Sequence, residues 1–153
     1  MQSSLANRDI ASQIKVVGLT AQSGVAAGAG DNTEVTSDAI DRVPTGLPMF
    51  LSAVFVAAYL TTVQAANTLK ITLKISESDD GSSWGADETL LNAVTMETGL
   101  VTAKKSAYEL GIDLSKRKRY VRFKVTLDLS AGAADTFVYA SSLVLGGSDD
   151  LPV

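Results

Sequence analysis

Apolar and polar residues alternate along much of this chain with a period of two. In the run YVRFKVTLDL, residues 120–129, every second residue from Val121 to Leu129 is apolar, and the residues between are charged or polar. A strand points successive side chains to opposite faces, whereas an amphipathic helix requires a period of about 3.6. Residues 69–76 and 108–114 repeat the alternation. The pattern predicts strands that bury one face.

Two further runs are apolar at odd and even positions alike. Residues 47–63, LPMFLSAVFVAAYLTTV, carry no charge, and residues 136–145, TFVYASSLVL, are similar. Strands covered on both faces have this composition. A membrane helix is disfavoured for the first run, because it falls short of about 20 apolar residues and contains Pro48. We therefore predict two strands buried on both faces, and no membrane partner.

Clusters of Gly, Ser and Asp separate these runs, and weaker strand patterns cover residues 14–20, 88–94 and 100–104. Seven or eight strands without a helical period predict an all-β fold. The expected architecture is a two-layer antiparallel β-sandwich that is jelly-roll-like, with an immunoglobulin-like sandwich as the alternative. A length of 153 residues fits a single domain.

The expected sandwich domain spans residues 14–145. Within it, residues 20–38 are small, polar and rich in glycine, which predicts a long mobile loop. Residues 1–13 and 146–153 are predicted to be extended terminal arms that reach over a neighbouring subunit. Residues 1–13 are polar with mixed charge and do not have the pattern of a signal peptide.

The chain contains no histidine and no cysteine. These residues supply the commonest general base, the thiol nucleophile and most ligands for zinc, copper and haem. A Ser-His-Asp triad is therefore excluded, and nothing in the sequence selects a pair of carboxylates for glycoside hydrolysis. We predict a protein that is not an enzyme and that holds no cofactor and no metal. The missing cysteines are typical of a protein made in a reducing cytoplasm.

The segment SESDDGSSW, residues 76–84, gathers acidic residues beside a glycine. A calcium loop of the EF-hand type requires oxygen ligands at alternate positions and a glutamate at the twelfth, and this spacing does not match. The turn preferences of Asp and Gly instead predict an acidic hairpin in which a buried Trp84 anchors the return strand.

Positive charge is concentrated in one part of the chain. The net charge is -4, but residues 104–124 hold eight of the thirteen basic residues against two acidic ones, so this segment is +6 and the remainder is -10. No aromatic residue is interleaved with the basic run before Tyr120. An acidic protein with one basic stripe fits an acidic protein partner better than a nucleic acid.

This basic stripe comprises Lys116, Arg117, Lys118, Arg119, Arg122 and Lys124. Two interpretations remain open. The stripe is either a solvated turn and strand face that discourages edge pairing, or a surface that docks on a carboxylate-rich protein. We predict that the stripe contacts neighbouring proteins, together with the terminal arms and in particular Leu151, Pro152 and Val153.

The C-terminal half resembles a known family. The run LSKRKRYVRFKVTLDLSAGAADTFVYASSLVLGGSDDLPV, with ISESDDGSSW upstream, is similar to the tailed-bacteriophage capsid decoration, or cement, proteins that bind the outside of the head. The matching features are the Arg119-Tyr120 start of a long alternating strand, the turn that ends at Thr136, and the closing Gly146-Gly147. The resemblance covers residues 69–153.

The resemblance implies a structural virion protein on the capsid exterior, synthesised in the cytoplasm of the bacterial host. It would bind the major capsid protein as a homo-oligomer, a dimer or a trimer, and clamp neighbouring capsomers without catalytic residues. A hydrophobic content of 46% and a mean hydropathy of +0.18 fit self-association. Two alternatives stay open: a structural component of a phage tail or neck, and a carbohydrate-binding module, which would require a groove lined by the few aromatic residues.

Overall fold

The computed structural model describes residues 14–43, 49–130 and 134–148. Its strands are β1 (Lys15–Ala26), β2 (Val35–Thr36), β3 (Ile40–Asp41), β4 (Phe50–Ser78), β5 (Glu88–Asp113), β6 (Tyr120–Leu129) and β7 (Thr136–Ser148), and every pairing is antiparallel. The described residues contain no helix of the length and apolar character needed to cross a membrane.

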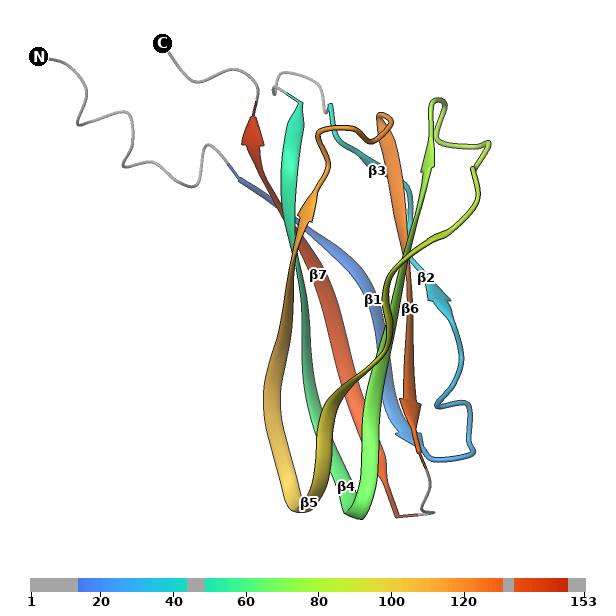
Figure 1. Ribbon diagram of the computed structural model, residues 1–153, viewed down its shortest axis with the longest axis vertical. Helices are drawn as coiled ribbons and strands as arrows, with labels where there is room; N and C mark the ends of the chain where they lie inside the picture. Colours follow the sequence, from blue (N-terminus) through green and yellow to red (C-terminus); the bar gives the residue numbers. More distant parts are fainter. Residues whose placement is uncertain (1–13, 44–48, 131–133, 149–153) are drawn as a thin grey trace, which may run out of the picture.

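Strands β4 and β5 form one long hairpin that folds back on itself. They pair from Ser52 opposite Asp113 to Ile75 opposite Glu88, and the register shifts between Thr61 and Thr68. Near this point Ala66 and Gly99 have φ angles of 70° and 57°, which reverse the direction of both strands. Figure 1 shows the paired reversal at the foot of the molecule.

The fold of this hairpin creates two layers. The first half of β4 pairs with β7, and its second half pairs with β6. One layer therefore has the order β1–β7–β4–β5, and the other has the order β5–β4–β6 followed by the short strands β2 and β3. The prediction of an all-β, two-layer antiparallel sandwich is confirmed. A long hairpin folded across two layers is the arrangement of a jelly roll rather than of the immunoglobulin-like alternative.

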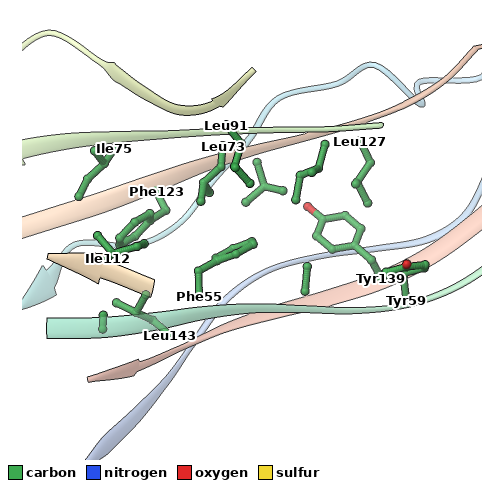
Figure 2. Packing of buried hydrophobic residues seen from close by; sticks show 14 of the residues in the cluster. Phe55, Tyr59, Leu73, Ile75, Leu91, Ile112, Phe123, Leu127, Tyr139 and Leu143 are labelled. Atoms are coloured by element: carbon green, nitrogen blue, oxygen red, sulfur yellow. The ribbon is translucent and has the colours of Figure 1, made fainter. Parts of the chain in front are cut away.

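The core lies between the layers and follows the alternation seen in the sequence. All five apolar residues at alternate positions of β6, from Val121 to Leu129, are at most 4% exposed. Figure 2 shows Phe55 of β4 and Phe123 of β6 both in the interior between the strands. Full burial of one such side chain contributes about 1.5–3 kcal/mol, so the strand pairs are stabilised mainly by this shared interior.

A buried carboxylate braces the reversal of β4. Asp135 is 0% exposed. Its carboxylate accepts hydrogen bonds from the Gln64 backbone N–H and the Asn67 side-chain amide, both at 2.8 Å. Its backbone carbonyl accepts a bond from the Ala27 N–H at 3.2 Å. One residue before β7 therefore ties the end of β1 to the point where β4 changes layer.

The predicted mobile loop over residues 20–38 is wrong in its first part, because residues 20–26 belong to β1. Thr20 is buried, and its hydroxyl lies 2.8 Å from the Ser141 hydroxyl and 3.0 Å from that of Tyr139. Small polar residues here pair across strands instead of forming a loop. The buried Asp31 also accepts a bond from the Leu129 N–H at 3.2 Å, which attaches the following turn to β6.

Other strand boundaries differ from those predicted. Residues 146–148 belong to β7, where Gly146 pairs with Ser52, so the C-terminal arm does not begin at 146. Residues 88–94, 100–104 and 108–114 form not separate strands but a single β5, which ends at Asp113. Residues 1–13 and 149–153, predicted to be arms, lie outside the described residues.

The prediction that residues 47–63 and 136–145 form strands covered on both faces is wrong for the described part of these runs. Val54, Leu60 and Val138 are 41%, 39% and 41% exposed, although their neighbours Phe55, Tyr59 and Tyr139 are buried. The half of β4 that pairs with β7, and β7 itself, therefore bury one face only and carry apolar residues on the other.

We expect Asp135→Ala to lower the free energy of unfolding by about 2–3 kcal/mol, because the substitution removes two hydrogen bonds to a buried carboxylate. The matched control is Asp38→Ala, since Asp38 is exposed, and its expected effect is within about 0.5 kcal/mol. Urea unfolding followed by tryptophan fluorescence measures both. Equal stabilities of the two variants would show that Asp135 does not brace the reversal.

Candidate protein-interaction surface

The basic turn between β5 and β6, residues 114–119, is held in place by the buried side chain of Arg42. This side chain is 0% exposed. Its guanidinium donates to the Phe50 carbonyl at 2.9 Å, to the Lys118 carbonyl at 3.0 Å and to the Arg117 carbonyl. Burial lowers the pKa of Arg42. The residue links the start of β4 to the basic turn, and its role has no signal in the sequence because its bonds are to backbone carbonyls of distant segments.

The basic stripe is paired with carboxylates of the same chain. Arg117 forms a two-pronged ion pair with Glu88, one bond of which is 2.7 Å long. Lys118 binds Asp79 at 2.6 Å. Asp79 lies in the acidic hairpin and Glu88 follows it, so this region and the basic turn carry opposite charges that pair with each other.

Two later residues of the basic stripe, Arg119 and Lys124, also form ion pairs with carboxylates of the same chain. Arg119 binds Asp41 of β3 at 2.8 Å. Lys124 lies 2.7 Å from Asp87 and 3.5 Å from Glu34. The bond from Lys124 lowers the pKa of Asp87, and the bond from Arg119 lowers that of Asp41.

Arg122 is held by an aromatic ring instead of a carboxylate. Its guanidinium lies 4.4 Å from the centre of the Trp84 ring, and its Nε donates to the Ser76 hydroxyl at 3.0 Å. Trp84 is half-buried and lies in the turn before β5, which differs from the predicted buried anchor within the return strand.

The acidic hairpin is ordered by its own hydrogen bonds. The Asp80 carboxylate accepts from the backbone N–H groups of Ser83 and Ser82 at 2.7 and 2.8 Å, and these bonds hold its pKa well below the usual range. Among the described residues, no three acidic side chains converge in a way that could hold a metal ion.

The outer face of the layer formed by β4, β5 and β6, here called the charged face, is therefore nearly balanced. Six carboxylates lie on the basic stripe: Glu34, Asp41, Glu77, Asp79, Asp87 and Glu88. Of the six stripe cations, Lys116 is exposed and makes no ion pair with a described residue. Leu151, Pro152 and Val153 lie outside the described residues.

The opposite outer face has a different character. It is formed by β1, β7 and the halves of β4 and β5 that share their layer. Apart from Lys15 of β1, no charged residue lies in β1, in β7 or in this half of β4. Its apolar outward residues, here called the apolar face, are Val16, Val54, Val56, Ala58, Leu60, Ala107, Val138, Ala140 and Val144. Ser142 lies among them opposite Val56, and Lys105 and Glu109 of β5 border them opposite Leu60 and Val56.

The apolar face is not flat, because rows of larger side chains lie on either side of a shallow hollow. Val16, Val144 and Val54 form one row across the strands, and Leu60 and Val138 form another. Between them Ala58 pairs with Ala140, and beside this small pair lies a shallow hollow of about 380 Å³. Because Val16 is 62% exposed and Leu60 is 39% exposed, the ridges beside the hollow are accessible to a partner.

The carboxylates of the charged face provide a pH test. The bond from Lys74 lowers the pKa of Glu34, and the bond from Lys124 lowers that of Asp87, from ordinary values of 4.5 and 3.8. A carboxyl whose pKa is lower in the folded state contributes stability that is complete above its unfolded pKa and lost as the pH falls through the folded one.

We therefore expect Lys124→Met to flatten the dependence of the melting temperature on pH between about pH 5 and pH 2. The variant and the wild type should converge at the acid end of this range. Lys116→Met is the control and should keep the wild-type slope, because Lys116 makes no ion pair with a described residue. An unchanged slope in Lys124→Met would show that these pairs are not formed in solution.

Comparison with known proteins finds structures of similar fold but no matching family. No family model matches the chain, and no curated protein matches it. Among solved structures, that of the infectious bursal disease virus Gx strain is similar with a TM-score of 0.50 and 10% identity over 91% of this chain. A VP2 subviral particle of the same virus gives a TM-score of 0.49 and 9% identity over 92% of this chain. The PBSX exported protein XepA gives a TM-score of 0.48 and 21% identity over the whole chain.

This chain spans 33%, 34% and 42% of the lengths of those three chains, respectively. At such identities the likeness establishes the fold alone. The chain has a jelly-roll fold, and this fold is similar to that of a chain in the structure of the infectious bursal disease virus Gx strain.

Proposed function

We propose that this chain is a non-catalytic structural protein of a virus particle, which binds the outer surface of a bacteriophage head and stabilises contacts between capsomers. The major capsid protein is the proposed partner, and the exterior of the virion, after synthesis in the host cytoplasm, is the proposed location. We assign the docking role to the apolar face.

The difference between the two outer faces carries this proposal. Five of the six cations of the basic stripe already have carboxylate or aromatic partners, and an exposed pair of this kind adds little further attraction for a third group. The apolar face presents Val54, Leu60 and Val138 to solvent, each about two-fifths exposed. Burial of this surface against a protein is favourable without breaking any ion pair.

Fold and sequence likeness agree with a structural role in a virion. The jelly roll is similar to a chain of an icosahedral virus, and residues 69–153 resemble the decoration proteins of tailed phages. Many copies on one shell need only weak individual binding, since the assembled lattice holds them together.

The described aromatic residues do not favour a carbohydrate-binding module. Such a site stacks sugars on exposed rings in a groove. Tyr59 and Tyr139 are 6% and 2% exposed and serve the core, and Trp84 is covered on one side by Arg122. A tail or neck component remains the competing proposal, and the binding experiment below separates it from the decoration role.

The experiment adds purified protein to heads of the encoding phage assembled without it and measures co-sedimentation. Leu60→Lys places a charge in the row that Leu60 and Val138 form on the apolar face and is expected to weaken binding about tenfold or more. The matched control is Thr126→Lys on β6, an outward position of the charged face between Lys124 and Asp128, which is expected to bind as the wild type does.

Salt dependence distinguishes the two faces. Binding through the apolar face should change little between about 0.1 and 0.5 M salt, whereas binding through the basic stripe should weaken strongly. Loss of binding in Lys116→Glu but not in Leu60→Lys would transfer the docking role to the stripe. Saturable binding to tail tubes in place of heads would support the tail alternative.

A further inference from the structure

The outer edge of β5 has properties that the proposed docking to a head does not use. Strand β5 pairs with β4 and with no other described strand, although it forms the end of both layers. The core is also incompletely covered here: Leu90, Val94, Met96, Tyr108 and Leu110 of β5 pack against it while remaining partly exposed. A free edge beside half-covered apolar side chains is a site at which a further strand can add.

The hydrogen bond from the Leu114 N–H to the Leu51 carbonyl, at 2.8 Å, shows which residues of β5 direct their backbone groups towards β4 and which direct them away from it. In an antiparallel ladder, every second residue exchanges bonds with the neighbouring strand, and the residues between direct theirs to the other side. The register is continuous from Asp113 to Lys104, so the N–H and C=O groups of Lys105, Ala107, Glu109 and Gly111 point to the open edge.

The charges on this edge are complementary to themselves. Lys105 and Glu109 lie two residues before and two residues after Ala107, and all three are exposed. If two copies pair antiparallel about a two-fold axis at Ala107, Lys105 of each copy lies opposite Glu109 of the other. The residues that face each other are then those with free backbone groups.

Other two-fold registers are less favourable. An axis at Glu109 would place two glutamates opposite each other, and an axis at Lys105 would place two lysines opposite each other, which is destabilising. An axis at Tyr108 would pair Glu109 with Ala107 and leave both charges without an opposite charge. The register centred on Ala107 is the one that forms two unlike pairs and no like pair.

We propose that two copies of this chain form a dimer by pairing their β5 strands antiparallel about Ala107, which joins two sheets into one across the axis. The added strand covers the open side of Tyr108 and Leu110. This proposal concerns the protein alone in solution and does not depend on binding to a head, so its test and that of the proposed function give separate answers.

The test exchanges the two charges one at a time and together. Wild-type protein is expected to sediment at twice the chain mass of 15.9 kDa. Glu109→Lys and Lys105→Glu each create two like-charge pairs, and each should weaken the dimer about tenfold or more. The double variant with both substitutions restores unlike pairs and should dimerise as the wild type does. Lys116→Glu, a charge reversal away from the edge, is the control and should leave the dimer intact.

Mixing the two single variants gives the sharpest result. Their charges are complementary to each other, so an equimolar mixture of Glu109→Lys and Lys105→Glu is expected to form a heterodimer although each variant alone is mostly monomeric. Circular dichroism confirms that each variant is folded. A monomeric wild type, an odd-numbered oligomer, or single variants that dimerise unchanged would overturn the proposal.

Discussion

The structure depends on the folding of one long hairpin. Strands of 29 and 26 residues with an apolar face cannot stay flat in water, because that face would remain exposed along its whole length. Reversal of both strands near Ala66 and Gly99 brings the apolar face against itself. The buried Asp135 holds this reversal with two hydrogen bonds, and β1, β6 and β7 then complete layers whose order is already set.

The folding of the hairpin also places the uncharged half and the charged half of β4 in different layers. The half of β4 that pairs with β7 contains no charged residue, whereas the half that pairs with β6 contains Lys70, Lys74 and Glu77. One strand thus supplies the apolar face at one end and part of the charged face at the other. Five of the six cations of the basic stripe have partners within the chain, whereas the apolar face carries exposed valine and leucine side chains.

Sequence patterns predicted those parts of the fold in which one strand face is polar. The alternation in residues 120–129 matches β6 residue for residue, and it predicted both the buried face and the outward Arg122 and Lys124. The same reasoning failed for β4 and β7. Apolar residues at odd and even positions alike indicate a strand buried on both faces only if other parts of the chain cover both faces. Here no described residue covers Val54 or Val138.

The candidate site was harder to predict than the fold, because it depends on contacts between distant residues. A run of four cations is visible in the sequence, but the carboxylates that bind it come from segments as far away as Asp41 and Glu88. The small, polar and glycine-rich composition of residues 20–26 predicts a loop, because the sequence does not reveal that Thr20 pairs with Ser141, 121 positions away. Arg42 gave no signal at all, since its partners are backbone carbonyls.

The central claim is that this jelly roll acts as a structural element of a virion by burying its apolar face on a capsid surface. Electron cryo-microscopy of phage heads incubated with the purified protein tests the claim most directly. We expect density at fixed symmetry positions on the outside of the head, with β4 and β7 against the shell and the basic turn directed away from it. Heads without added density, or copies attached through the charged face, would contradict it.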